Sequence, residues 1–393
     1  MEQQNNLKKL TVSILSLSLL TVMAGAAVAP ALGSIKQYFI NENPLFVQMI
    51  ISMPSLFIIL TNLIFPKLCA RFGSKTLVLT GLMLYTAGGC IAGLFNNIFL
   101  LLLTRALVGV GVGIIMPLST GLLSFYFAPE AQDKLMGYSS AMNQLGGAVA
   151  TLFSGLLASI SWRFSFFVYA LGLISIVLCI FFLPNDKIAG STHENSCEES
   201  SEHMKTSTGT ASIIRENIFS IAAIFLLMVT FFIYPANFAM IASQSGIIPH
   251  NMIAIIMSGM DIIAFIGGLS FVSLKKLLAK KIRFLAPCLF LTGYLLLSLG
   301  NSAVYVIVGS VLIGFANGVG IPCIISHTSQ KVGKNAASSI MPLLSAALYG
   351  GQFFTPFITS LVSAAFSGGP LLLPYYIAVF SSVLFALASS AIK

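Results

Sequence analysis

Charged residues are scarce in this sequence of 393 residues. Only 8% are Asp, Glu, Lys or Arg, whereas 57% are hydrophobic, and the mean hydropathy is +0.97. A soluble domain carries about 25% charged residues. Because a soluble chain this apolar could not cover its surface with polar groups, the composition excludes an ordinary soluble protein and indicates one whose solvent is the bilayer.

Acidic residues are the scarcer charged class, with 11 against 20 Lys and Arg, and the net charge is +9. The basic residues lie in short loops between apolar runs, so membrane topology explains them better than a nucleic-acid partner, and none is expected. The six cysteines show no metal-ligand spacing and no disulfide framework. No Gly-x-x-x-x-Gly-Lys-Ser/Thr motif and no cluster typical of an active site occurs, so the sequence predicts neither an ATPase nor another enzyme, and no cofactor or metal.

Long apolar runs dominate the chain instead. A helix needs about 20 apolar residues to cross the hydrocarbon core of a membrane. Twelve runs meet this requirement, and they lie near 10–32, 44–65, 76–95, 98–122, 136–159, 164–183, 216–241, 247–272, 284–300, 303–325, 336–363 and 371–391. The sequence therefore predicts an all-α membrane protein with twelve transmembrane helices.

The distribution of Lys and Arg predicts the orientation. If the N-terminus is inside the cell, 17 of these residues lie in cytoplasmic segments and only Lys36 and Arg163 lie outside. This asymmetry predicts that both termini are cytoplasmic. Lys8 and Lys9, an apolar stretch and Ala27-Val28-Ala29 also resemble a cleavable signal peptide, but the internal repeat requires this stretch as a permanent helix.

The two halves of the chain match at an offset of 205 residues. The matching pairs are Pro30 and Pro235, Gly109 and Gly314, Gly113 and Gly318, Pro117 and Pro322, Gly146 and Gly351, Arg71 and Lys276, and Lys75 and Lys280. They predict two pseudo-symmetric six-helix bundles, 1–184 and 215–393, joined by a flexible polar cytoplasmic linker at 185–214. Transporters with such parallel repeats bind substrate near the bilayer midplane and rock one half against the other.

Three short motifs carry a family resemblance. The loop at 66–75 resembles Gly-x-x-x-Asp-Arg-x-Gly-Arg/Lys-Arg/Lys, with Ala70 in the place of the acid. The segment 105–113 resembles Arg-x-x-Gln-Gly-x-Gly, with Val108 in the place of Gln, and 143–155 resembles a glycine-rich antiporter motif. Over nearly its whole length the sequence resembles the major facilitator superfamily, and most closely its twelve-span bacterial drug:proton antiporters.

The resemblance implies a monomeric secondary transporter in the cytoplasmic membrane of a bacterium, with a small-molecule substrate. It implies a gating loop that contains Arg71, Gly73 and Lys75, although Arg71 and Lys75 could be topology determinants only. It also implies a cavity lined by the first, fourth, seventh and tenth spans. The candidate substrate-pathway residues on these and neighbouring spans are Met23, Arg105, Met116, Asn143, Gln144, Phe231, Phe232, Tyr234, Asn237, Asn317 and Gln352. For each of them, packing or lipid contact is the alternative.

Two charged residues lie inside predicted spans. Arg105 lies about 10 Å from the external end of its span at 1.5 Å per residue. A charge at this depth is expected to face a cavity or a gate, although its long side chain could instead extend outward to water. Asp261 is the only acid deep in a span. Because an ionised carboxylate is costly there, Asp261 is a candidate proton-coupling site, with a structural hydrogen-bonded Asp as the alternative.

These features favour proton-coupled efflux of small amphipathic compounds. The alternative of the same fold is an importer or uniporter of a metabolite or organic anion, and the alternative from another class is a membrane sensor on a transporter scaffold. Many antiporters of cationic drugs hold an acid in the first span, and this sequence has none there. Neutral amphipathic or anionic substrates are therefore at least as consistent with it as cations.

Overall fold

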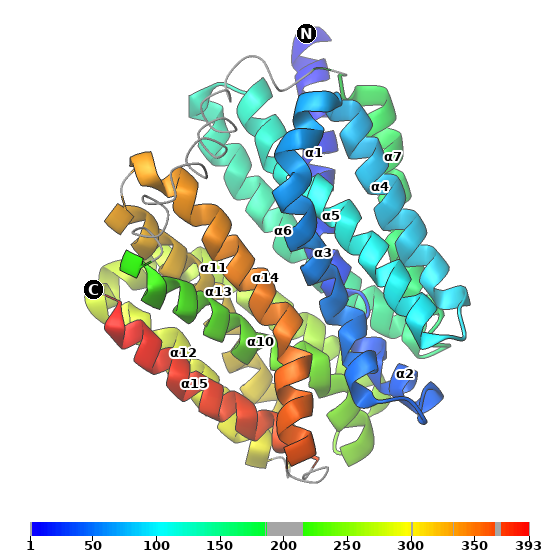
Figure 1. Ribbon diagram of the computed structural model, residues 1–393, viewed down its shortest axis with the longest axis vertical. Helices are drawn as coiled ribbons and strands as arrows, with labels where there is room; N and C mark the ends of the chain where they lie inside the picture. Colours follow the sequence, from blue (N-terminus) through cyan, green and yellow to red (C-terminus); the bar gives the residue numbers. More distant parts are fainter. Residues whose placement is uncertain are drawn as a thin grey trace. The chain divides into compact units, whose positions relative to one another are not determined.

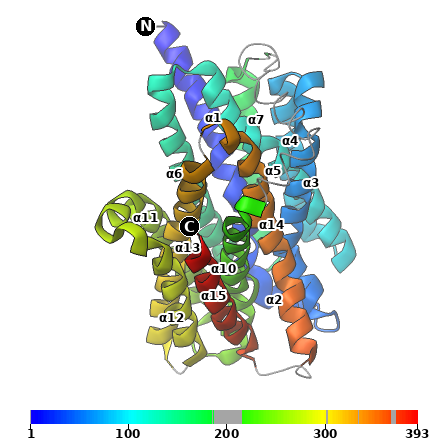
Figure 2. The same cartoon turned by 60° about the vertical axis from the view of Figure 1, so that its left-hand side comes forward.

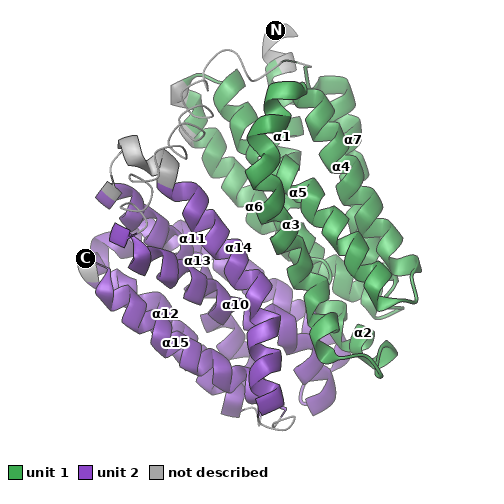
Figure 3. Ribbon diagram, in the orientation of Figure 1, with its two compact units in different colours: residues 1–195 green, residues 196–393 purple. Residues whose placement is uncertain are grey.

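The computed structural model describes residues 2–184, 186, 215–299, 302–332, 334–365 and 371–392. Within these residues the chain forms helices and contains no strand (Figure 1). Two compact units divide it at 195/196, which lies inside the expected linker (Figure 3). Apart from Asp186, the linker expected at 185–214 lies outside the described residues.

Unit 1 contains six long helical segments. They are α1 (Glu2–Ala26), continued by η1 (Ala29–Ala31) and α2 (Leu32–Tyr38); α3 (Pro44–Arg71); α4 (Ser74–Ile91), continued by η2 (Ala92–Leu94); α5 (Ile98–Tyr126); α6 (Pro129–Ala158); and η3 (Phe164–Ala170), continued by α7 (Leu171–Phe182).

Unit 2 contains six more, which are α10 (Ile218–Ser245), α11 (His250–Leu278) followed by η5 (Ala279–Lys281), α12 (Ile282–Leu299), α13 (Ala303–Val332), α14 (Lys334–Ala365) and α15 (Leu373–Ala391). Eleven of the helices among the described residues are long and apolar enough to cross a membrane. The twelfth, α14, has 32 residues but a more polar sequence that includes Tyr349 and Gln352. The prediction of a twelve-helix, all-α membrane fold is confirmed.

Polar residues at the predicted breaks begin the helices. The Asn43 side chain accepts a hydrogen bond from the Leu45 amide at 2.9 Å, and Pro44 occupies the first position of α3. The Asn97 side chain accepts from the Phe99 amide at 2.8 Å at the start of α5. Asn caps satisfy amides that have no partner inside a helix, and Pro loses nothing at a first helical position.

The helices of each unit pack in the same pairs. In unit 1, α5 packs against α3 and α4, and α1 packs against α6. In unit 2, α13 packs against α11 and α12, and α10 packs against α14 (Figures 1 and 2). Each unit therefore repeats one arrangement of six helices, as the offset of 205 residues predicts.

The repeated glycines explain these pairs physically. A Cβ atom built on Gly146 of α6 would lie 1.9 Å from the Leu19 carbonyl oxygen of α1. A Cβ atom on Gly351 of α14 would lie 2.7 Å from the Phe225 carbonyl oxygen of α10. Membrane helices approach closely where small residues face each other, so the paired glycines fix the same helix contact in both units.

Replacing Gly146 with Ala should destabilise unit 1, because the added methyl group would force α6 away from the backbone of α1. Overpacking of this kind costs about 1–3 kcal/mol. The matched control is Gly137→Ala on the same helix, where a Cβ atom meets nothing within 4 Å. We expect a lower melting temperature in detergent for Gly146→Ala only. Equal melting temperatures for the two variants would contradict the close contact.

Candidate functional site

Arg105 of α5 is completely buried inside unit 1. Its Nε donates a hydrogen bond to the Ile50 carbonyl oxygen of α3 at 3.0 Å, and its Nη2 donates to the Tyr169 hydroxyl at 2.8 Å and to the Ala24 carbonyl oxygen of α1. The Tyr169 hydroxyl donates to the same Ala24 oxygen at 2.7 Å. The side chain therefore does not extend outward to water, and it connects α1, α3, α5 and η3.

The two carbonyl groups that Arg105 binds are ones that their own helices leave without a donor. Pro54 has no amide hydrogen, so the Ile50 carbonyl four residues earlier loses its helical partner. Ala24 lies in the last turn of α1, where the carbonyl groups also lack partners within the helix. Arg105 thus satisfies the backbone at two helix irregularities, and its positive charge lies at a helix C-terminus, where a cation is favourable.

Tyr169 belongs to this cluster although the sequence analysis did not select it. Its ring centroid lies 4.9 Å from the Arg105 guanidinium carbon and 5.2 Å from the ring centroid of Tyr85. A buried tyrosine hydroxyl normally finds a hydrogen-bond partner. A tyrosine within an apolar run was therefore the available signal, but its partner, 64 positions earlier in the chain, could not be read from that run.

Unit 2 satisfies its own proline break with neutral groups. Pro235 of α10 deprives the Phe231 carbonyl of its helical donor. The Tyr294 hydroxyl of α12 donates to the neighbouring Thr230 carbonyl oxygen at 2.5 Å and lies 3.4 Å from the Phe231 oxygen. The repeat offset maps Arg105 to Ser310, which accepts a hydrogen bond from Tyr234 at 2.7 Å. The buried cation therefore has no counterpart at the equivalent place in unit 2.

Asp261 lies on α11 in a half-buried position, close enough to the Tyr234 hydroxyl of α10 to interact with it electrostatically. Tyr234 is completely buried, and its ring stacks on Phe238 with centroids 4.4 Å apart. Among the membrane-spanning helices that the structure describes, Asp261 is the only acidic residue. Unit 2 thus combines its one intramembrane acid with a tyrosine and Ser310 in a chain of polar groups.

The other candidate pathway residues of unit 1 lie on α1, α5 and α6. Met23 of α1 is buried, whereas Met116 of α5 and Gln144 of α6 are half-buried. The Asn143 side chain of α6 accepts a hydrogen bond from the Thr21 hydroxyl of α1 at 2.5 Å. The structure brings Asn143 to α1, and the pathway role of all four residues stays a prediction.

The remaining candidates in unit 2 lie on α10, α13 and α14. On α10, Phe231 is half-buried and Phe232 is buried, and the buried Asn237 donates from Nδ2 to the Ile233 carbonyl oxygen at 2.9 Å. Asn317 of α13 is 7% exposed, and its Oδ1 has no hydrogen-bond partner among the described residues. Gln352 of α14 is half-buried. Their roles also stay predictions.

The candidate gating loop connects α3 to α4. Arg71 is exposed at the end of α3, Gly73 directly precedes α4, and Lys75 donates from Nζ to the Ile180 carbonyl oxygen of α7 at 2.7 Å. The Ser74 amide donates to the Asp186 carbonyl oxygen at 3.0 Å, so the segment after α7 lies against this loop.

Asp186 is the acidic residue that the structure places beside the loop, where the family motif has an acid and this chain has Ala70. The Tyr126 hydroxyl, at the end of α5, donates to Asp186 Oδ2 at 2.8 Å. Asp186 thus connects the start of α4 to the end of α5. The sequence analysis missed this residue, because nothing in its local sequence indicates that the chain returns to α4.

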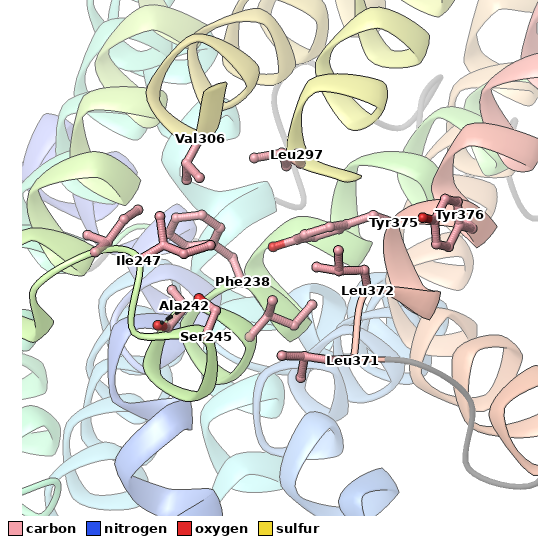
Figure 4. A pocket seen from close by; sticks show the side chains of 12 residues that line it. Phe238, Ala242, Ser245, Ile247, Leu297, Val306, Leu371, Leu372, Tyr375 and Tyr376 are labelled. Atoms are coloured by element: carbon pink, nitrogen blue, oxygen red, sulfur yellow. Dashed lines mark hydrogen bonds between the residues drawn. The ribbon is translucent and has the colours of Figure 1, made fainter. Parts of the chain in front are cut away.

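Two cavities occur in unit 2, and the first is apolar. It has a volume of about 380 Å³. Figure 4 shows the Tyr375 ring extending toward Phe238, with Tyr376 at the margin. Its lining residues are Phe238, Ile241, Ala242, Ser245, Ile247, Ile248, Leu297, Val306, Leu371, Leu372, Tyr375 and Tyr376. Such a lining suits an apolar or aromatic group.

Two like-built six-helix bundles with polar groups inside their helices have the architecture of a secondary transporter. The profile of the Major Facilitator Superfamily matches residues 14–356, and the chain belongs to this family of transporters. Multidrug resistance protein 2 of Bacillus subtilis (strain 168) is 27% identical over 261 residues, which are 65% of this chain and 61% of that protein. Quinolone resistance protein NorA of Staphylococcus aureus is 28% identical over 121 residues, 30% of this chain and 31% of that protein.

Solved structures show the same fold. The nucleoside transporter NupG superposes with a TM-score of 0.77 at 13% identity, covering 98% of each chain. A D-xylose–proton symporter superposes with a TM-score of 0.75 at 13% identity, also covering 98% of each chain. The fold is therefore that of the family, whereas the matched segments span less than two thirds of the length of both curated relatives.

Proposed function

We propose that this transporter is a proton-coupled exporter of small amphipathic molecules. The observation that carries the proposal is Asp261, the one acid in the described membrane-spanning helices, which lies within electrostatic reach of buried Tyr234. An intramembrane acid of this kind favours binding a proton, because the ionised carboxylate is costly there. Protonation and deprotonation of Asp261 would couple transport to the proton gradient.

The chemical class of the substrate follows from what the helices offer. The first span has no acid that would pair with a cationic drug, and the apolar cavity of unit 2 is lined by aliphatic and aromatic side chains. These features support neutral or anionic amphipathic substrates. The two named relatives are drug-resistance proteins, which supports export rather than uptake.

The location and orientation belong to the same proposal. The excess of Lys and Arg on one side supports both chain ends in the cytoplasm of a bacterium and a place in the cytoplasmic membrane. Arg71, Gly73 and Lys75, together with Asp186, would hold the cytoplasmic ends of α3, α4 and α7 while the transporter changes conformation. The working unit would be the monomer.

Vesicle transport tests direction and coupling together. An expressing strain is first screened for growth on a panel of toxic compounds and organic anions, and the compound that it tolerates best becomes the substrate. Inverted vesicles should then accumulate this compound when their lumen is acidic, and should not do so when the gradient is reversed or collapsed. Accumulation only under the opposite gradient would indicate a symporter, and accumulation that ignores the gradient would indicate a uniporter; either result would contradict the proposal.

A further inference from the structure

The second cavity of unit 2 lies where α11 ends and α12 begins, and it has a volume of about 530 Å³. Residues of α11, η5, α12, α13 and α15 line it, and Figures 1 and 2 show α12 and α15 side by side along this part of the unit. Three lining residues, Lys275, Arg283 and His327, are basic, and none is acidic. The cavity is therefore chemically different from the apolar one described above.

The basic groups lie close to one another. The His327 imidazole interacts electrostatically with Lys275, Arg283 and Lys331. Like charges repel more strongly in a partly buried site than in water. An anion in the cavity would relieve this repulsion, so the charge pattern favours an anionic occupant.

Hydrogen-bond donors in the cavity are only partly used. Lys275 donates to the Ser326 hydroxyl at 2.9 Å, which uses one of its three donors. Arg283 Nη1 donates to the Ile392 carbonyl oxygen at 2.8 Å, whereas its Nε is buried and has no acceptor among the described residues. A guanidinium with a free edge matches the oxygens of a phosphate group.

The repeat shows that the fold does not require these charges. The Cβ positions of Gly88 in α4 and Gly293 in α12 meet equivalent residues of α5 and α13 at the offset of 205, which fixes the register of these helices. In that register Arg283 corresponds to Val78, and His327 corresponds to Leu122; both of these residues are completely buried in unit 1. The basic residues are thus particular to unit 2.

The rest of the cavity wall is apolar. Phe271, Ile282 and Phe385 line it, each less than 10% exposed. On α11, which contributes one wall, Val272 is 60% exposed and Leu277 is 80% exposed, as expected for side chains that face lipid. An occupant with an anionic head and a hydrocarbon chain matches both parts of the cavity, whereas a free inorganic anion would match only the basic part.

We propose that this cavity binds an anionic phospholipid, with the phosphate between Lys275 and Arg283 and the start of an acyl chain against Phe271 and Phe385. Basic pockets between membrane helices are typical sites for anionic head groups. The distribution of Lys and Arg predicts that this end of unit 2 faces the cytoplasm, where the leaflet carries anionic lipids. The volume lies within the range of about 300–1,000 Å³ that small-ligand pockets have.

Lipid titration of the purified full-length transporter tests the proposal. Phosphatidylglycerol, phosphatidylcholine and inorganic phosphate are added separately in a neutral detergent, and bound lipid is counted by native mass spectrometry alongside the melting temperature. We expect phosphatidylglycerol to bind and to raise the melting temperature, and the other two to do neither. Lys275→Gln and Arg283→Gln should each weaken phosphatidylglycerol binding about fivefold, the effect of one cation near an anionic surface.

The matched controls are Lys276→Gln and Lys281→Gln, which remove exposed cations of the same segment outside the cavity. They should bind phosphatidylglycerol as the unmodified chain does. If Arg283→Gln fails to fold, His327→Gln and Lys275→Gln provide the test. Unchanged affinity in the cavity variants, equal binding of phosphatidylcholine, or displacement of phosphatidylglycerol by inorganic phosphate would each overturn the proposal.

Discussion

Asp261→Asn should abolish transport driven by a pH gradient while the protein still inserts and folds. The amide has nearly the same size as the carboxylic acid and can still form hydrogen bonds near Tyr234, but it cannot bind and release a proton. No other acid is present in the described membrane-spanning helices to replace it. Gradient-driven accumulation in vesicles should therefore fall to the level of vesicles that lack the protein.

Exchange of labelled for unlabelled substrate without a gradient should persist in this variant, because exchange does not require deprotonation of the carrier. The control is Glu216→Gln, which removes an exposed acid just before α10 and should leave accumulation unchanged. Full gradient-driven accumulation by Asp261→Asn would remove Asp261 from the coupling mechanism. Loss of exchange together with accumulation would instead indicate a structural Asp.

Arg105→Leu should destabilise unit 1 by about 2–5 kcal/mol, because the Ile50 and Ala24 carbonyl groups would both lose a buried donor. No backbone amide replaces it at Ile50, since Pro54 follows four residues later. Arg105→Lys should lie between Leu and the native residue, because one ammonium lacks the fork that reaches two helices. The measurement is the melting temperature in detergent, which should fall by at least about 5 °C for Arg105→Leu.

The matched control for Arg105 is Arg71→Leu, which removes an exposed guanidinium whose recorded ring contact is with its neighbour Phe72. Its melting temperature should stay close to that of the native chain. If Arg105→Leu melted at the native temperature and only lost transport, Arg105 would act in the pathway rather than in holding α1 and α3.

Hydropathy predicted all twelve helices, but not their full lengths. The span expected at 303–325 belongs to α13, which continues to Val332, and the span expected at 44–65 belongs to α3, which continues to Arg71. The apolar pattern reports the part of a helix that meets lipid, whereas hydrogen bonding continues the helix beyond it. The repeated glycines predicted the paired helices because a small residue is required where two backbones nearly touch.

The partners of the buried polar residues could not be predicted in the same way. Arg105 was recognisable as a costly charge, yet two of its three acceptors are backbone carbonyl groups, which no residue type announces. Pro54 carried a usable signal, because a proline in a helix leaves the carbonyl four residues earlier without a donor. Asp186 carried none, since its contacts with Ser74 and Tyr126 join segments more than 50 residues apart.

Substrate-driven proton movement in liposomes tests proton-coupled export most directly. Liposomes that contain the purified transporter and a pH-sensitive dye are loaded with substrate and diluted into substrate-free buffer at the same pH. If substrate and protons move in opposite directions, the lumen must acidify as substrate leaves, and liposomes with the Asp261→Asn variant must show no change. Alkalinisation of the lumen, or substrate efflux with no change of pH in the native protein, would contradict the account.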